Sequence, residues 1–215
     1  MGGGSGMTGR LIETDGDVRE GAQWLSQTCP RLAYAFDQTG PLPLRRRPDG
    51  FAQLLSAIVS QQVSVASARA IWAKLEAAGM VDPATVRAAC EDDLRALGLS
   101  RQKIRYAHAL VAADIDYAGL RSLPDGEVIK TLVAVPGIGN WTAEIYAMFS
   151  LGRADVFAPG DLALQEAARS LYALDARPKE SALREMAVAW SPWRSVAARL
   201  LFAYYRVVKQ REGIT

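Results

Sequence analysis

The sequence predicts an all-α protein, because apolar residues recur with the period of an α-helix along most of the chain. Apolar stripes with the spacing i, i+3, i+4 and i+7 cover residues 51–59, 65–75, 104–111 and 196–207. No segment combines alternating apolar and polar residues with the turn chemistry of a β-hairpin. We therefore expect eight to eleven short helices.

Capping residues and chain breaks indicate where these helices begin and end. Asp82 followed by Pro83 is typical of an N-cap and a first helical residue, and Ser100 is placed to cap the helix that runs through Arg105. We expect two helical lobes, with the N-terminal and C-terminal segments meeting in one of them. The connections between helices are predicted at residues 40–48, 119–124 and 152–160.

The composition excludes several classes of protein. Half of the 215 residues are hydrophobic and 22% are charged, which suits one large domain or two small ones and argues against disorder. Two cysteines and one histidine exclude a cysteine-ligated iron–sulfur cluster and a zinc site built from several histidines. The net charge of +2 identifies no partner by itself.

The sequence shows no signal for membrane insertion or export. No apolar run approaches the roughly 20 residues of a membrane span, so no membrane partner is expected. Without an export signal or a disulfide pattern, a cytoplasmic protein is the expectation. Residues 1–6, Met-Gly-Gly-Gly-Ser-Gly, are interpreted as a flexible linker left by cloning, and residues 7–215 as the folded domain.

The segment Pro136-Gly137-Ile138-Gly139 is the first that indicates chemistry. It separates two helical patterns, so residues 128–150 are predicted to form a helical hairpin. Two glycines around one apolar residue permit a tight turn, and the following helix presents free backbone N–H groups. Such a helix start binds phosphate without base specificity. The alternative is an ordinary corner between two helices.

Asp161 is the second feature. It follows Pro159-Gly160 and precedes an apolar helical pattern. This position suits an N-cap, and it equally suits a functional carboxylate that the cap hydrogen bonds hold in place.

The hairpin followed by a loop that ends in an aspartate resembles the helix–hairpin–helix DNA glycosylases of base excision repair. Two further blocks, Ala57 to Ser67 and Trp190 to Ser195, are similar to the alkylation-repair subgroup, the 3-methyladenine DNA glycosylase II type. The resemblance covers about residues 48–206. It implies a compact form of that type, lacking the N-terminal β domain of the larger bacterial enzyme, with the active site in a cleft between two helical lobes.

The resemblance also implies roles for individual residues. Asp161 matches the essential aspartate, and Gln62 matches the residue that fills the gap left by a flipped base. Trp141 stands where members that cut the DNA backbone carry a lysine, so no lyase step is expected. The expected base pocket comprises Trp141, Ile145, Phe202 and Trp24, and for Trp24 a position in the core is the favoured alternative. The expected DNA-binding residues are Gln61, Gln62, Pro136, Gly137, Ile138, Gly139 and Thr142. The carbonyls of Val133, Val135 and Ile138 match those that bind a monovalent cation.

The resemblance thus implies a monofunctional DNA glycosylase that hydrolyses the N-glycosidic bond of alkylated purines, such as 3-methyladenine and 7-methylguanine. A cationic base is a good leaving group, and aromatic faces attract it. Its partner is expected to be double-stranded DNA with damaged bases, bound by a monomer in the nucleoid, and no organic cofactor is implied. The alternatives are a non-catalytic helix–hairpin–helix DNA-binding protein and a glycosylase for other damaged bases.

Several remaining residues keep two interpretations. Trp72, Trp190 and Trp193 are interpreted as packing residues, and His108 as a surface or packing histidine. The basic groups Arg45–Arg47 and Arg101/Lys103/Arg105 either contact phosphates or are simply solvated.

Overall fold

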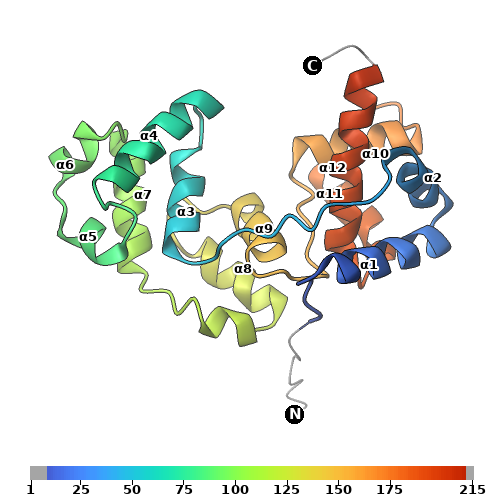
Figure 1. The fold of residues 1–215 in the computed structure, drawn as a ribbon, viewed down its shortest axis with the longest axis horizontal. Helices are drawn as coiled ribbons and strands as arrows, with labels where there is room; N and C mark the ends of the chain where they lie inside the picture. Colours follow the sequence, from blue (N-terminus) through green and yellow to red (C-terminus); the bar gives the residue numbers. More distant parts are fainter. Residues whose placement is uncertain (1–8, 212–215) are drawn as a thin grey trace. The chain divides into compact units, whose positions relative to one another are not determined.

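The computed structural model describes residues 9–211, and within them it is helical, with one isolated β-bridge between Leu11 and Arg153 and no strand (Figure 1). The chain divides into two compact units. We call residues 47–146 the middle unit, and residues 9–46 with 147–211 the terminal unit. The predicted all-α fold is confirmed. The N-terminal and C-terminal segments share one unit, as the sequence led us to expect.

The middle unit is built around α7, which packs against α3, α5 and α6. Its helices begin at the predicted signals: the Asp82 carboxylate accepts the amides of Ala84 and Thr85, and the Ser100 hydroxyl accepts the amide of Lys103. The helices are α3 (Phe51–Val59), α4 (Val65–Ala77), α5 (Pro83–Ala88), α6 (Glu91–Ala96), α7 (Arg101–Ala112), the 3₁₀ helix η1 (Gly119–Ser122), α8 (Asp125–Val133) and α9 (Asn140–Phe149), in which the boundary between the units falls.

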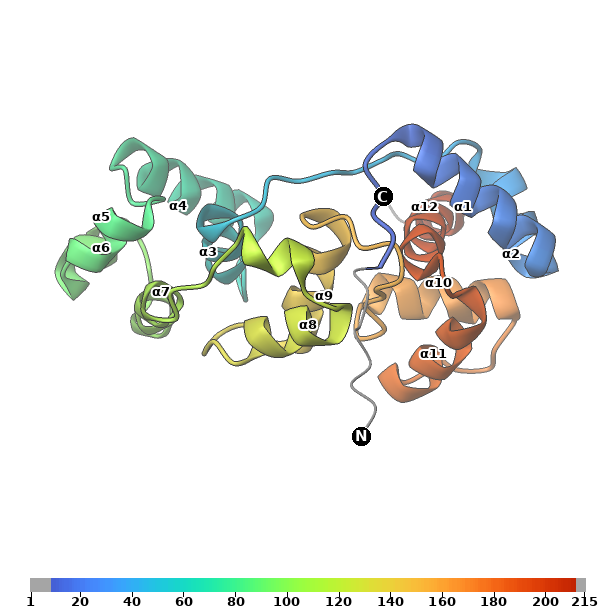
Figure 2. The same ribbon diagram turned by 90° about the horizontal axis from the view of Figure 1, so that it is seen from below.

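The terminal unit is built around α12, which packs against α1, α2 and α10 (Figures 1 and 2). Its core includes Trp190 and Trp193, each at most 3% exposed, which confirms their interpretation as packing residues. The helices are α1 (Asp15–Thr28), α2 (Pro30–Thr39), α10 (Leu162–Tyr172), α11 (Glu180–Met186), the 3₁₀ helix η2 (Ala187–Trp190) and α12 (Arg194–Arg211).

Two expectations were wrong. Residues 9–211 contain twelve α-helices rather than eight to eleven, because short helices such as α6, with six residues, show no helical repeat. The stripe over residues 65–75 is not a core face: Val65 is 70% exposed, Trp72 is half-buried, and Leu75 is the buried residue of α4. The neighbour of α4 is α3, which covers only part of that stripe.

No helix within residues 9–211 combines the length and the apolar character that crossing a membrane requires.

Candidate functional site

The predicted hairpin lies in the middle unit between α8 and α9. Its turn is held by two short-range hydrogen bonds, from the Val135 amide to the Leu132 carbonyl and from the Ile138 amide to the Val135 carbonyl. The Ile138 side chain is 3% exposed and anchors the turn in the core. The carbonyl of Gly139 accepts the amide of Ala143, so α9 begins directly after the second glycine. The first turn of α9, whose N–H groups lie outside the hydrogen-bond ladder of the helix, therefore follows the hairpin.

Glycine is present at the two hairpin positions for different structural reasons. Gly137 adopts a φ of +94°, and a Cβ there would lie 2.4 Å from the Tyr106 ring. A Cβ on Gly139 would meet nothing within 4 Å, and its φ is not in the left-handed region. Gly137 is thus required by the fold. Gly139 is not, and its exposed backbone leaves open space where a ligand can approach closely.

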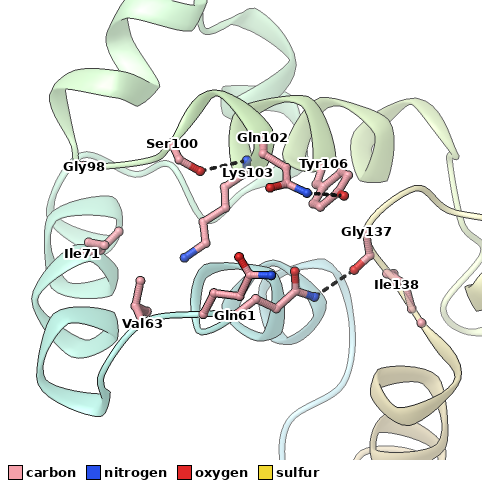
Figure 3. Close-up of a pocket in the computed structure, with 12 residues that line it drawn as sticks. Gln61, Val63, Ile71, Gly98, Ser100, Gln102, Lys103, Tyr106, Gly137 and Ile138 are labelled. Atoms are coloured by element: carbon pink, nitrogen blue, oxygen red, sulfur yellow. Dashed lines mark hydrogen bonds between the residues drawn. The ribbon is translucent and has the colours of Figure 1, made fainter.

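The hairpin borders a cavity of about 670 Å³ (Figure 3). The loop after α3 supplies one wall, the start of α7 a second, and the hairpin a third. The cavity is lined by Gln61, Gln62, Val63, Ile71, Gly98, Ser100, Gln102, Lys103, Tyr106, Gly137, Ile138 and Gly139. Among these residues Lys103 is the only charged one. The lining contains no carboxylate that would repel a phosphate.

Gln61 joins two walls of this cavity. Its Nε2 donates a hydrogen bond of 2.9 Å to the Gly137 carbonyl, as Figure 3 shows. Gln62, the next residue, is exposed and adopts a φ of +56°, which is rare for a residue with a side chain. A strained and exposed residue beside the hairpin fits the predicted gap-filling role, while Gln61 holds the loop against the hairpin.

The structure corrects the interpretation of Lys103. Lys103 is not simply solvated, because the residue is 8% exposed, and its ammonium donates a hydrogen bond of 2.6 Å to the Val59 carbonyl rather than extending toward a phosphate. That carbonyl belongs to the last turn of α3, where a cation is favourable. Burial lowers the pKa of Lys103. Its flanking residues Arg101 and Arg105 are exposed, so both of their interpretations remain open.

Asp161 lies in the terminal unit at the start of α10. Its Oδ1 accepts the amides of Ala163 and Leu164, at 2.9 and 3.2 Å, so the predicted cap is present. The preceding loop is tied at Pro159, whose carbonyl accepts the buried side-chain amide of Gln165 at 2.8 Å. The carboxylate is half-buried. The cap therefore fixes its position without enclosing it.

The loop that leads to Asp161 is fastened at its other end as well. Ala154 donates its amide to the Arg10 carbonyl and accepts the amide of Ser195. Asp155 forms a two-bond ion pair with Arg194, at 2.7 and 2.8 Å, and accepts the Ser191 hydroxyl at 2.8 Å. Burial alone would raise the pKa of Asp155, but the hydrogen bonds from Arg194 and Ser191 outweigh it and the pKa lies below its ordinary value. These ties make the loop a rigid support for Asp161.

The four expected pocket residues divide between the units. Trp141 is 46% exposed on the first turn of α9, and Ile145 lies one turn later on the same face and is half-buried. Trp24 on α1 and Phe202 on α12 are both half-buried in the terminal unit. Each has surface available to a ligand, and their assembly into one pocket stays a prediction.

Two further site predictions change in detail. Thr142 is 6% exposed, so it has little surface with which to contact DNA. Of the expected cation ligands, the Val135 carbonyl already accepts the Ile138 amide, which leaves it one further lone pair. Backbone carbonyls fit the chemistry of a monovalent cation, and this site stays a prediction.

Ser100, Gln102 and Tyr106 were missed by the sequence reasoning, although they line the cavity. Gln102 donates a hydrogen bond of 2.7 Å to the Tyr106 hydroxyl. The burial of Lys103 had a detectable signal, because Lys103, Ala107 and Leu110 share the helical spacing of the buried face. The contact of Tyr106 with Gly137 joins residues 31 positions apart, and no pattern in the sequence indicates it.

A hairpin that opens one helix and a fixed loop that ends in a capping aspartate define a helix–hairpin–helix protein, with a cavity beside the hairpin. The comparisons with known proteins identify the family. Residues 55–192 match the HhH-GPD superfamily of base excision DNA repair proteins, and the chain belongs to it.

Individual relatives agree. A DNA-3-methyladenine glycosidase from Bacillus halodurans is similar in structure, with a TM-score of 0.81 and 31% identity over 94% of both chains. A 3-methyladenine DNA glycosylase from Schizosaccharomyces pombe, solved in complex with abasic DNA, has a TM-score of 0.72 and 26% identity over 85% of this chain and 95% of the other. A putative DNA-3-methyladenine glycosylase of Bacillus subtilis is 26% identical over 90% of this chain and 71% of its own length.

Proposed function

We propose that the chain is a DNA glycosylase that releases alkylated purines by hydrolysis of the N-glycosidic bond and leaves an abasic site. The observation that carries this proposal is the likeness to the Bacillus halodurans 3-methyladenine glycosidase over 94% of both chains. The lesion lies inside the duplex, so the base must first be flipped out. The hairpin and its cavity serve as the DNA contact, and Gln62 fills the gap.

Asp161 is the proposed catalytic residue. A purine alkylated at N3 or N7 carries a positive charge and leaves readily, so the main requirement is to stabilise the sugar cation that forms as the bond breaks. A carboxylate held at a helix start can do this by its charge or by orienting a water molecule toward C1′. The cap bonds to Ala163 and Leu164 support this role, because they fix the carboxylate before substrate arrives.

The cationic base is proposed to stack on aromatic side chains. Trp141 offers its exposed ring on α9, and Phe202 and Trp24 offer partly exposed rings in the terminal unit. A cation over such a ring gains about 0.5–2 kcal/mol. Because Trp141 replaces the amine that a Schiff-base mechanism needs, the reaction ends at the abasic site without cutting the backbone.

Asp161→Asn tests the proposal, since it keeps the size and the acceptor oxygen of the side chain but removes its charge. The wild type should release methylpurine from methylated duplex DNA, and the variant should release at least about a hundredfold less, the scale of losing one electrostatic group in a transition state. Its affinity for a duplex with a tetrahydrofuran abasic analogue should stay within a few-fold. Equal release by both proteins would reject Asp161 as the catalytic group.

The same experiment distinguishes a glycosylase from a protein that only binds DNA. A helix–hairpin–helix protein that only binds DNA would release nothing in either form and would bind the duplex with a strong salt dependence. We further propose that a monomer acts on double-stranded DNA. Sedimentation of the protein with a lesion duplex at a one-to-one ratio checks this stoichiometry.

A further inference from the structure

Arg45 lies over the ring of Phe202, with its guanidinium carbon 5.8 Å from the ring centroid. Both residues are half-buried and both belong to the terminal unit. This is the geometry in which an aromatic face attracts a cation. The protein's own cation therefore occupies a face that the proposed function gives to the cationic base.

The residues on either side of Arg45 are held, Leu44 by its carbonyl and Arg46 by its side chain. The preceding residue, Leu44, offers its carbonyl to Arg199 Nε at 3.1 Å. The following residue, Arg46, donates to the Ile12 carbonyl at 3.4 Å and packs against Gly152, where a Cβ would overlap its guanidinium. Between these two fixed residues Arg45 adopts a φ of +52°. A side-chain-bearing residue keeps this conformation only when its surroundings impose it.

The Arg45 guanidinium itself is not held by polar contacts within residues 9–211. Within residues 9–211 no hydrogen bond or ion pair involves its side chain, whose contact is the Phe202 ring. Arg199 is the contrast. It is 1% exposed, lies 4.8 Å over the Phe149 ring and donates hydrogen bonds to Leu44 and Ser195. Arg199 is a fixed part of the core, and Arg45 is a cation that can leave its ring.

The positive charges near Phe202 would repel a second cation at this site. Burial and the nearby charge of Arg46 together lower the pKa of Arg199 to about 10, so like charges are close. Phe202 is also in contact with Phe149, with ring centroids 6.3 Å apart. A cationic base that stacks on Phe202 must therefore displace Arg45 or share a ring with it at the expense of like-charge repulsion.

We propose that Arg45 is a specificity-determining residue: it occupies the electron-rich face of Phe202, so that a positively charged base must compete with it for the pocket. This inference rests on the proposed function. A ligand can bind only those molecules in which the competing internal group has left the site. Its apparent affinity is therefore the intrinsic affinity multiplied by the fraction of such molecules. The penalty falls on bases that need the ring face, and it is absent for DNA that carries no base at the lesion.

The test compares two duplexes, one with a single 7-methylguanine and one with a tetrahydrofuran abasic analogue. Single-turnover release gives the half-saturation constant for the first, and direct binding gives the dissociation constant for the second. Any phosphate contact of Arg45 affects both duplexes alike. In Arg45→Gln the half-saturation constant should fall about two- to fivefold relative to the change in abasic affinity, the fold-change that a cation–π contact of about 0.5–1 kcal/mol produces.

Two controls test whether the effect of Arg45→Gln arises from competition for the Phe202 ring. Arg206→Gln removes the same charge from an exposed position on α12 and should leave the ratio of the two constants unchanged. In a Phe202→Leu background, Arg45→Gln should have no further effect on that ratio, because the ring for which the two cations compete is gone.

Three results would overturn the inference: an unchanged ratio in Arg45→Gln, a rise in the half-saturation constant relative to abasic affinity, or a fall that persists without Phe202. If the wild type released no methylpurine at all, the proposed function would fail and this inference with it. Wild-type release combined with an unchanged ratio would overturn the role of Arg45 alone.

Discussion

The two hairpin glycines should respond to alanine in opposite ways. In Gly137→Ala the new Cβ must adopt a left-handed backbone, which costs about 1–2 kcal/mol, and must overlap the Tyr106 ring at 2.4 Å, which adds about 1–3 kcal/mol of overpacking. The free energy of unfolding should therefore fall by about 2–5 kcal/mol. At about 2–4 °C per kcal/mol for a chain of this size, the Tm should fall by roughly 4–20 °C.

Gly139→Ala introduces a methyl group where no atom lies within 4 Å and no left-handed φ is required. Its unfolding free energy should stay within about 0.5 kcal/mol of the wild type. The methyl group does occupy the space through which a phosphate would reach the hairpin amides. Loss of one hydrogen bond to a charged group is about 1.5–3 kcal/mol, so affinity for the abasic duplex should fall at least about tenfold.

Thermal unfolding and duplex binding of the two variants, measured side by side, separate stability from DNA contact. The reasoning would be refuted if Gly139→Ala melted as low as Gly137→Ala. It would also be refuted if Gly139→Ala melted normally and bound the abasic duplex as tightly as the wild type, because the hairpin would then not touch DNA at this residue.

Three further predictions concern the support of the site and its pocket. Asp155→Asn should lower the unfolding free energy by about 1–3 kcal/mol at pH 7. Because the folded pKa of Asp155 lies below its ordinary 3.8, the wild-type advantage should persist above about pH 4 and vanish as the pH falls below the folded pKa, which urea unfolding at several pH values checks. Lys103→Met leaves the Val59 carbonyl without its 2.6 Å donor and should cost about 1–3 kcal/mol in the same assay; an unchanged midpoint would contradict the capping role. Trp141→Ala should raise the half-saturation constant for 7-methylguanine release about 2- to 30-fold, with abasic affinity as the reference.

Local signals in the sequence were sufficient for most of the helices and for the hairpin. The stripe over residues 51–59 has the spacing of one buried face, and that face is buried in α3. Asp82, Ser100 and Asp161 act on amides two or three residues away, so their caps can be inferred without knowing the fold. The pattern failed for α4, because a helical stripe predicts a buried face only when another element covers it.

The cavity depends on contacts that no local pattern contains. Gln61 reaches Gly137 across 76 positions of the chain, and Lys103 reaches Val59 across 44. A glutamine in a polar loop and a lysine on a helix have many possible partners, and only the packing of α3, α7 and the hairpin selects these. The support of Asp161 by Asp155 and Arg194 is long-range in the same way.

The most direct measurement of the central claim is the product analysis of a duplex that carries one 7-methylguanine, incubated with the wild-type protein. The account predicts free 7-methylguanine in the supernatant and a DNA strand that stays intact until alkali cleaves it at the abasic site. Strand cleavage without alkali would contradict the assignment of Trp141 as the residue that replaces a catalytic amine. Absence of 7-methylguanine release from this duplex, together with absence of 3-methyladenine release from a methylated duplex that contains it, would contradict the glycosylase itself.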